Sequence, residues 1–208
     1  MKGYKADTIR NIALLGHGGT GKTTFLEAAL LATGVINRLG KVEDGNTVSD
    51  FDKMEIEKGY SISLSIVPIE YNKTKINFLD TPGVFDFVGE VNSAVRAAEA
   101  AAIFVDASSG IQVGTEKAWN TCQEFGIPRF FIINKIDKPA ARIDEVKDEI
   151  SDLFLELATD ESQLNYPIYY AIAREGKAGK TTDLDPDLHV IFESIINDIP
   201  APQVDEND

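Results

Sequence analysis

Hydrophobic positions along this chain follow two different periods. Short runs of consecutive or alternating apolar residues predict buried strands, whereas apolar residues three or four positions apart predict helices that cover those strands. Strands are expected at residues 8–15, 61–66, 75–79, 102–105, 130–133 and 168–173, and helices at residues 24–33, 87–100, 115–125, 143–157 and 188–199. Because strands and helices alternate, the pattern predicts an α/β fold.

The same alternation predicts how the strands are arranged. We expect a doubly wound, mostly parallel six-stranded sheet with helices on both faces and one antiparallel strand. The antiparallel strand is the one in which Ile62, Leu64 and Ile66 alternate with serines, because a turn at residues 71–73 leads back into residues 75–79. A polar stretch at residues 35–60 has little periodicity, and we interpret it as a mobile loop with a functional role.

Length and composition indicate a single domain. The chain has 208 residues, 43% of them hydrophobic, which suits one core over residues 1–199. Residues 200–208 are rich in proline and acidic residues, so we expect a linker or tail there, with further domains beyond it. The N-terminus lacks the apolar core of a signal peptide, and the longest apolar run, residues 100–105, is too short to span a bilayer. We expect a cytoplasmic protein with no membrane partner, and a monomer.

Charge and cysteine content narrow the function further. The net charge of −14 opposes a broad basic surface of the kind that follows nucleic-acid phosphates, so no autonomous DNA or RNA binding is expected. Cys122 is the only cysteine, which excludes an internal disulfide and fits a reducing cytoplasm. We interpret Cys122 as a buried helix thiol beside Trp119.

A glycine-rich motif lies between the first strand and the first helix. From Gly16 to Thr23 the sequence reads G-H-G-G-T-G-K-T, which satisfies G-x-x-x-x-G-K-[ST] in the strand-loop-helix context that this motif requires. The glycines let backbone N–H groups approach phosphates, Lys22 reaches the β/γ oxygens, and Thr23 offers its hydroxyl to Mg²⁺. An ordinary glycine-rich turn is the alternative. The predicted phosphate-binding residues are Gly16, His17, Gly18, Gly19, Thr20, Gly21, Lys22, Thr23 and Thr24.

Two further motifs follow predicted strands. Asp80 begins the sequence D-T-P-G, in which Asp80 would hold Mg²⁺ through water and Gly83 would contact the γ-phosphate. The sequence N-K-I-D runs from Asn134 to Asp137, and a carboxylate there can accept from both the ring N–H and the exocyclic amine of guanine, a pair that adenine lacks. Each motif alone is compatible with a polar turn. Three motifs in this order on three strand ends favour a GTP site.

Together these motifs resemble those of the translational GTPases. Residues 10–30 and 58–137, with D-F-V-G-E-V at 86–91, are most similar to elongation factor G relatives. The part from Asn134 onward is more similar to the ribosome-associated GTPase TypA/BipA, in the segments N-K-I-D-K-P-A-A-R-I-D-E-V, D-E-S-Q-L-N-Y-P-I-Y-Y-A and N-D-I-P-A-P-Q-V-D. The subdomain that elongation factor G inserts before its last strand is missing. The resemblance covers nearly the whole chain. It implies a P-loop NTPase fold and a GTP-binding, GTP-hydrolysing switch domain of a translation (elongation) factor, with Mg²⁺, GTP/GDP and, through the full-length protein, the ribosome as its partners.

The resemblance also implies roles for single residues. Ser61 stands where the family's R-G-I-T motif has the threonine that closes over Mg²⁺ and the γ-phosphate, so residues 35–60 become the first switch and residues 81–90 the second. The N–H of Ala173 would meet guanine O6, and Arg174 would flank the base. The implied metal set is Thr23, Ser61 and Asp80, the catalytic set is Lys22, Thr23, Ser61 and Gly83, and the guanine set is Asn134, Lys135, Asp137, Ala171, Ile172, Ala173 and Arg174.

Two departures from the family pattern concern catalysis. The family writes D-T-P-G-H, where the histidine orients the attacking water or stabilises the transition state, but this chain has Val84. Losing such a group commonly costs on the order of 10²–10⁴ in rate, so hydrolysis is expected to be slow without the ribosome. Gly19 replaces a family aspartate, which removes a side chain associated with monovalent-cation assistance.

Two alternative functions stay open at this point. One is a GTP-binding module with little intrinsic hydrolysis, which Val84 and Gly19 would favour. The other is a ParA/MinD-like ATPase, whose G-G-x-G-K-T loop also fits, although its signature lysine would fall at His17. We interpret His17 as structural, His189 as an exposed helix residue, and Asp106 with Ser108 as a polar helix-entry turn.

Overall fold

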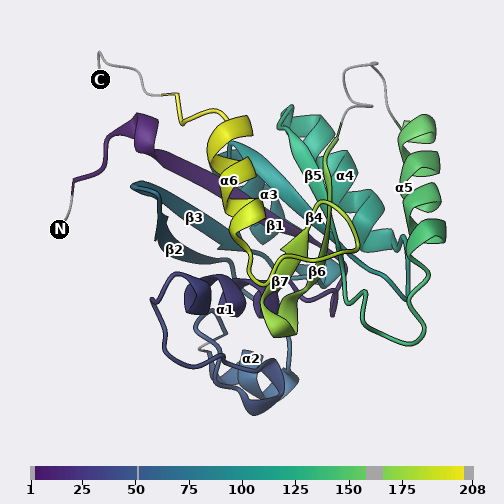
Figure 1. Cartoon of the computed structure of the whole chain (residues 1–208), viewed down its shortest axis with the longest axis horizontal. Coiled ribbons are helices and arrows are strands. Elements are labelled where there is room, and N and C mark those ends of the chain that lie inside the picture. The colour runs from purple at the N-terminus through teal and green to yellow at the C-terminus, as the bar shows by residue number, and fades with distance from the viewer. Residues whose placement is uncertain (1–2, 51, 158–165, 204–208) are drawn as a thin grey trace.

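The computed structural model describes residues 3–50, 52–157 and 166–203. In these ranges it has seven strands and six α-helices (Figure 1). The strands are β1 (Ile9–Gly16), β2 (Ser65–Tyr71), β3 (Thr74–Asp80), β4 (Ala100–Asp106), β5 (Arg129–Asn134), β6 (Ile168–Ile172) and β7 (Lys177–Gly179). The α-helices are α1 (Lys22–Ala32), α2 (Lys53–Lys58), α3 (Val88–Ala97), α4 (Val113–Phe125), α5 (Ile143–Leu157) and α6 (His189–Asp198).

All seven strands form one sheet in the order β2-β3-β1-β4-β5-β6-β7. The four pairings between β3, β1, β4, β5 and β6 are parallel, whereas β2 with β3 and β6 with β7 are antiparallel. The α/β class, the doubly wound arrangement and the β2-β3 hairpin are therefore confirmed. The expectation of six strands with one antiparallel strand is wrong by one strand, because β7 is a second antiparallel strand whose three residues are too few to show a period of two.

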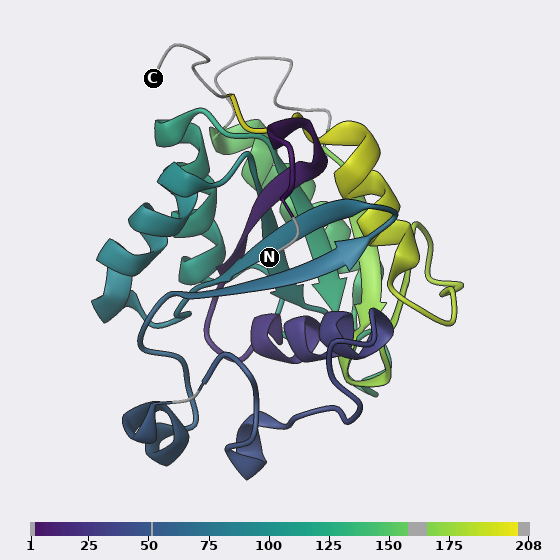
Figure 2. The same cartoon turned by 90° about the vertical axis from the view of Figure 1, so that its left-hand side faces the viewer.

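Helices cover both faces of the sheet, as Figures 1 and 2 show. Alternate side chains of β1 enter opposite layers, because successive side chains of a strand point to opposite faces. Ile12 and Leu14 join the core under α1 and α6, where Phe25 and Phe192 are fully buried. On the other face, the alternate residues of β1 lie in the core formed with α3, α4 and α5. Cys122 and Trp119 are both fully buried in this second layer, as expected.

The polar stretch at residues 35–60 contains more structure than its pattern indicates. It includes the short helix α2, whose start is fixed by a capping box between Asp52 and Glu55. The carboxylate of Glu55 also accepts hydrogen bonds from the N–H groups of Ile62 (2.9 Å) and Ser63 (3.0 Å). These N–H groups are thus bound by a side chain and not by a neighbouring strand, which explains why β2 begins at Ser65 and not at residue 61.

The carboxyl ends of the parallel strands meet along one edge of the sheet. The strands β1, β3, β4, β5 and β6 end there at Gly16, Asp80, Asp106, Asn134 and Ile172. Open α/β sheets bind ligands at this edge, because the loops that follow the strands diverge around a crevice. The fold therefore brings all three sequence motifs to the same side of the molecule.

The described residues bear on two expectations, one about a membrane-spanning segment and one about the C-terminal tail. No helix within residues 3–50, 52–157 and 166–203 has the length and apolar character needed to cross a bilayer. The predicted tail has no helix or strand at residues 200–203, and residues 204–208 lie outside the described ranges.

Candidate nucleotide-binding site

The glycine-rich loop joins the end of β1 to the start of α1. Its turn favours glycine at three places, because Gly16 has φ +133°, Gly19 has φ +77° and Gly21 has φ +98°, values that side chains disfavour. A Cβ atom on Gly16 would also lie 2.5 Å from the carbonyl oxygen of Phe104 in β4. Lys22 and Thr23 then begin α1 directly after the loop, so the helix N-terminus points its free N–H groups into the site.

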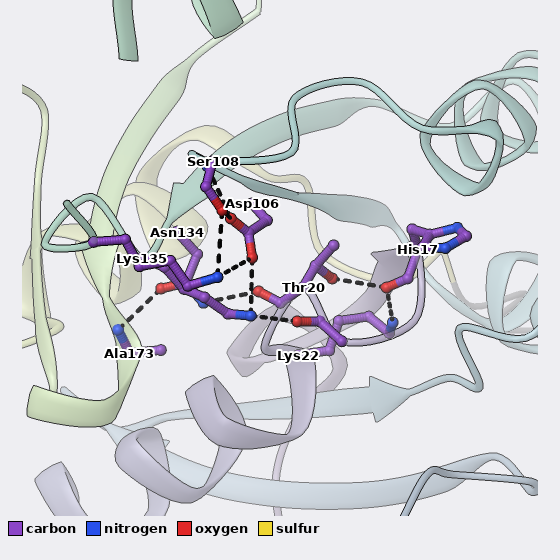
Figure 3. Close-up of polar contacts among 10 residues, drawn as sticks. His17, Thr20, Lys22, Asp106, Ser108, Asn134, Lys135 and Ala173 are labelled. Carbon is purple, nitrogen blue, oxygen red and sulfur yellow. Dashed lines mark hydrogen bonds and ion pairs between the residues drawn. The ribbon is translucent and has the colours of Figure 1, made fainter. Parts of the chain in front are cut away.

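The ammonium group of Lys22 lies folded back against this loop. Its Nζ atom donates to the carbonyl oxygens of Gly16 and His17, each at 3.1 Å, and Figure 3 shows the contact with His17. Burial lowers the pKa of Lys22 to about 8, although the carboxylates of Asp80 and Asp50 act in the opposite direction. A buried cation that is incompletely balanced favours an anionic ligand, as phosphate would be.

A second group of side chains lies beside Lys22. Thr23 donates its hydroxyl to Asp80 Oδ2 at 2.9 Å, and Ser61 donates to Asp50 Oδ1 at 2.7 Å. The hydroxyl oxygens of Thr23 and Ser61 are 3.4 Å apart, so the two pairs form one cluster. Burial raises the pKa of Asp80 to about 6 and also raises the pKa of Asp50.

Each of the two aspartates in this cluster has one carboxylate oxygen that could accept a hydrogen bond or bind a cation. Asp80 and Asp50 are 1% and 4% exposed, and one oxygen of each, Asp80 Oδ1 and Asp50 Oδ2, has no hydrogen-bond partner of ordinary geometry among the described residues. Buried carboxylate oxygens need a donor or a cation. Two acids and two hydroxyls are the ligand types that a small hard cation prefers. Sequence reasoning missed Asp50, which lies in a loop without a motif and reaches the cluster only through tertiary structure.

The loop after β3 closes against the glycine-rich loop. A Cβ atom on Gly83 would lie 2.6 Å from the backbone of Gly18 and 2.8 Å from Lys22 Nζ, so only glycine permits this approach. The next residue, Val84, lines the same cavity with a side chain that has no polar atom. Gly19 has open space around it and likewise offers no side chain.

Asn134 connects the guanine motif to the rest of the site. Its side chain is held by hydrogen bonds within the protein and is not free in the cavity. It is 1% exposed; its Nδ2 donates to the Thr20 carbonyl at 2.9 Å, and its Oδ1 accepts from the N–H of Ala173 at 3.0 Å. The Ala173 N–H, which the resemblance assigned to guanine O6, is therefore used by Asn134 in this structure (Figure 3). Asn134 ties the phosphate loop, β5 and the loop after β6 into one unit.

The other members of the guanine motif face the cavity. Lys135 adopts φ +64°, and its Nζ donates to the carbonyl of Gly19 across the site. Asp137 forms an ion pair with Arg174, which is mostly exposed. Ala171, by contrast, lies fully buried in the core beneath α1 and α6. Thus Ala171 supports the loop from below, while Arg174 touches the carboxylate that would read the base.

These groups surround one cavity of about 650 Å³. Its size is in the range of small-molecule sites. It is lined by fourteen of the predicted residues: Gly18, Gly19, Gly21, Lys22, Thr23, Thr24, Ser61, Gly83, Asn134, Lys135, Asp137, Ile172, Ala173 and Arg174. Five others do not line it: Gly16, His17, Thr20, Asp80 and Ala171. Lining residues that the motifs did not indicate include Leu39, Gly40, Lys41, Val42, Glu43, Asp50 and Lys138.

The structure also shows the positions of three other polar residues considered in the sequence: His17, His189 and Asp106. The carbonyl of His17 accepts from Thr20 and Lys22, in keeping with a structural role. His189 begins α6, away from the cavity, with its side chain 43% exposed and paired with Asp187 at 3.0 Å. Asp106 makes the expected turn with Ser108, but it also forms ion pairs with two lysines that sequence reasoning did not connect to it.

The fold and this cavity define a P-loop nucleotide-binding protein of the guanine-specific type, because a lysine-bearing glycine loop and an N-K-x-D loop meet at the carboxyl edge of one parallel sheet. Comparison with known proteins agrees. Residues 7–201 match the family described as "Elongation factor Tu GTP binding domain", and the chain belongs to this family. It is thus a GTP-binding domain of the translation-factor type, from a family of GTPases. The ParA/MinD-like ATPase alternative is wrong.

Two relatives match different shares of the chain. The "Large ribosomal subunit assembly factor BipA" of Escherichia coli (strain K12) is 34% identical over 200 residues, which cover 96% of this chain and 33% of that protein. The "Elongation factor G-like protein" of Mycobacterium tuberculosis (strain H37Rv) is 40% identical over 146 residues, which cover 70% of this chain and 20% of that protein. The chain therefore spans about a third of the length of BipA.

Solved structures show the same fold. A crystal structure of a protein from Thermus thermophilus has a TM-score of 0.66 and 38% identity, and the match covers 73% of this chain and 22% of that one. Translation elongation factor SelB from Methanococcus maripaludis, solved with the GTP analogue GppNHp, has a TM-score of 0.67 over 95% of this chain and 36% of that one. At 21% identity, SelB supports the fold alone.

Proposed function

We propose that this chain is the switch domain of a ribosome-associated factor, in which bound GTP is hydrolysed to GDP and phosphate. The observation that carries the proposal is the single cavity with Lys22 and Thr23 at one end and Asp137 at the other. These ends have the chemistry for a polyphosphate and for guanine, respectively. Relatives whose names refer to ribosome assembly or elongation support the ribosome as the partner, through a longer protein in the cytoplasm.

The phosphates would be held by the loop from Gly16 to Thr24. Backbone N–H groups of this loop and of the first turn of α1 supply donors, and Lys22 exchanges its two carbonyl contacts for phosphate oxygens. An anion beside Lys22 raises its pKa again, because the opposite charge favours the ammonium form. Gly83 contributes its backbone at the γ-phosphate end of the site, next to Lys22.

The residues present fit Mg²⁺. Thr23 and Ser61 offer hydroxyl oxygens, and Asp80 Oδ1 and Asp50 Oδ2, which lack a hydrogen bond of ordinary geometry among the described residues, offer negative charge. When bound there, Mg²⁺ would neutralise charge on the β- and γ-phosphate oxygens. The protein's own part is to hold both aspartates and both hydroxyls close together, and a bound cation would favour the ionised form of the aspartates that burial disfavours.

The base would be recognised by the loops after β5 and β6. Asp137 accepts from guanine, Lys135 lies along the cavity wall, and Ile172 and Arg174 border the base position. Arg174 already pairs with Asp137, so it orients the carboxylate before the base arrives. Since adenine lacks the paired donors that Asp137 needs, GTP is selected over ATP.

The two switches would be residues 35–60 with Ser61 and residues 81–90. Leu64, three residues after Ser61, donates its N–H to Glu90 of the second switch at 2.8 Å. A change at Ser61 is thus transmitted to α3 within a few residues. Ordering of these segments by Mg²⁺ and the γ-phosphate, and their release after hydrolysis, would produce the switch.

Hydrolysis by this domain alone would be slow. Val84 lines the cavity where the family has histidine, and an isopropyl group neither orients water nor donates to the transition state. The ribosome or another residue would have to supply this function. A second candidate, a GTP-binding module with little turnover, is favoured by the same observation and by the absence of a side chain at Gly19.

Nucleotide binding and turnover measured side by side test the proposal. Fluorescent GDP and GTP analogues should bind in the presence of Mg²⁺. Unlabelled GTP should displace them, but the same concentration of ATP should not. Equal displacement by ATP would contradict the guanine site. Single-turnover hydrolysis of GTP by the longer protein that contains this domain, with and without ribosomes, then separates the two candidates. Stimulation by ribosomes supports the switch, and tight binding without stimulated turnover supports the binding module.

A further inference from the structure

Asp106 lies at the point where the phosphate loop and the guanine loop approach each other. It ends β4, which lies between β1 and β5 in the sheet, and it pairs in register with Asn134. Its side chain is 8% exposed. A charged group with so little contact with water needs several polar partners, and Asp106 has them on both oxygens.

The two carboxylate oxygens of Asp106 have different partners. Oδ1 accepts from the backbone N–H of Ser108 at 2.8 Å and from its hydroxyl at 2.5 Å, which fixes the plane of the carboxylate. Oδ2 lies 3.0 Å from Lys135 Nζ and 2.9 Å from Lys138 Nζ. Figure 3 shows the contacts of the carboxylate with Ser108 and Lys135. Oδ2 thus contacts two ammonium groups, while Oδ1 is held by Ser108 in the turn that follows Asp106.

Asp106 remains ionised under ordinary conditions. Burial alone would raise its pKa, but the hydrogen bonds from Ser108 and from the two lysines hold the pKa well below its usual range. The two lysines also outnumber the one carboxylate at this point. Removing the carboxylate would therefore leave two ammonium groups close together without a counter-charge.

Lys135 is the partner that reaches the nucleotide cavity. Its backbone is in the left-handed region, with φ +64°, which directs the side chain from the end of β5 over the glycine loop. Its Nζ donates to the Gly19 carbonyl, and its Cε would lie 3.7 Å from a Cβ placed on Gly21. A long lysine side chain loses much rotamer entropy when it is fixed in this way. A second contact to the ammonium group offsets that loss.

We propose that Asp106 is a positioning residue that holds Lys135 across the cavity and thereby sets how long guanine nucleotide stays bound. The proposal rests on the proposed GTP site, because Lys135 acts there. Asp106 itself does not line the cavity. Lys138 has a supporting role, because it balances Asp106 from the other side and makes no contact with the glycine loop among the hydrogen bonds of the described residues.

A double-mutant cycle on the dissociation rate of a fluorescent GDP tests this role. Lys135→Met and Asp106→Asn are each expected to raise the dissociation rate, Asp106→Asn by about tenfold, a size common for residues coupled in one network. The double variant should be no faster than Lys135→Met alone, because Asp106 acts through Lys135. Lys138→Met should have a smaller effect than Asp106→Asn. Asp148→Asn, an exposed residue of α5, is the control with the same change of charge.

The outcomes distinguish this proposal from the proposed function. If Lys135→Met releases GDP no faster than the unmodified chain, the guanine site itself is wrong. If Lys135→Met is faster but Asp106→Asn is unchanged, or if the two effects multiply in the double variant, the positioning role is wrong. Should Asp106→Asn fail to fold, as circular dichroism would show, Asp106→Glu keeps the charge and takes its place in the cycle; effects that multiply with Lys135→Met again overturn the role.

Discussion

The hydroxyl of Thr23 donates to Asp80 across 2.9 Å, in a place where Asp80 is 1% exposed. This hydrogen bond joins the start of α1 to the end of β3, which are far apart in the sequence. The hydroxyl oxygen of Thr23 also lies 3.4 Å from that of Ser61, which itself donates to Asp50. We therefore expect the Mg²⁺ dependence of nucleotide binding to depend on Asp80.

Asp80→Asn is expected to weaken Mg²⁺ binding about 10- to 100-fold, the usual cost of losing a residue that supports a metal site. Titration of Mg²⁺ into the complex with fluorescent GDP measures this. In the unmodified chain, Asp80 has a pKa of about 6, so below pH 6 a proton competes with the cation and Mg²⁺ affinity should fall about tenfold per pH unit. An equal Mg²⁺ dependence in Asp80→Asn would contradict the assignment.

The raised pKa of Asp80 has a second consequence without metal. The folded chain binds the Asp80 proton more tightly than the unfolded chain does, whose pKa is about 3.9. The contribution of Asp80 to the free energy of unfolding therefore decreases as pH rises from about 4 to 6. This decrease should appear in the difference between the unmodified chain and Asp80→Asn, and it should be missing from that difference only if Asp80 does not bind the proton. Urea unfolding in EDTA at several pH values checks the sign.

Val84→His should raise the ribosome-stimulated rate of GTP hydrolysis by about 100-fold, because it restores a group that can orient water at the cavity wall. Single-turnover measurements on the longer protein that contains this domain provide the readout. Val113→His, which changes an exposed residue at the start of α4, is the matched control. An unchanged rate in Val84→His would remove Val84 as the cause of slow turnover.

Asp137→Asn is expected to lower GDP affinity about 100-fold, because two hydrogen bonds from guanine to a carboxylate are lost or weakened. The new amide can donate to the 2-oxo group of xanthine, so XDP should bind better than GDP. Competition between the two nucleotides measures the reversal. Asp152→Asn on the exposed side of α5 should show the original preference; a loss of preference in both variants would point to a general charge effect.

Glu27→Gln should loosen the first half of the proposed first switch. Glu27 is 1% exposed in α1, and its two oxygens accept from the N–H groups of Gly40 (3.0 Å) and Val48 (2.6 Å). A glutamine would direct an N–H group at one of these donors, at a cost of about 1–3 kcal/mol in unfolding free energy. Faster limited proteolysis at residues 40–48 is expected, whereas Glu57→Gln on exposed α2 should behave like the unmodified chain.

Cys122 should be inert in the native protein. It is fully buried in α4, and burial raises the pKa of its thiol to about 12. Iodoacetamide at pH 8 should therefore modify it only after the chain unfolds, since the thiolate is the reactive form. Comparison of labelling with and without guanidinium chloride measures the difference, and rapid labelling of the native chain would contradict the burial.

Some parts of the site were predictable because they depend on neighbouring residues. The loop from Gly16 to Thr23, the acid at Asp80 and the motif ending at Asp137 are each short segments at a strand end, and the apolar periods that predict those strands are local. Their spatial order then follows from parallel strands whose carboxyl ends share one edge. The GTP site could thus be inferred from order and context alone.

Other parts depend on contacts between distant segments. Asp50 meets Ser61 because α2 and its capping box fold the loop back, and Glu27 meets Gly40 and Val48 because α1 runs beside that loop. The hydrogen bond from the Ala173 N–H to Asn134 and the ion pairs of Asp106 with two lysines also join segments that are distant in the sequence.

The sequence by itself determined the α/β class, the phosphate loop and the preference for guanine, because repeated periods and contiguous motifs encode them. Only the tertiary structure decided which buried carboxylates gather beside Lys22, how the loop at residues 35–60 is anchored and which groups contact Lys135. Those features depend on the direction of side chains from separate elements, and hydrogen bonds of about 3 Å are sensitive to that direction in a way that no residue pattern records.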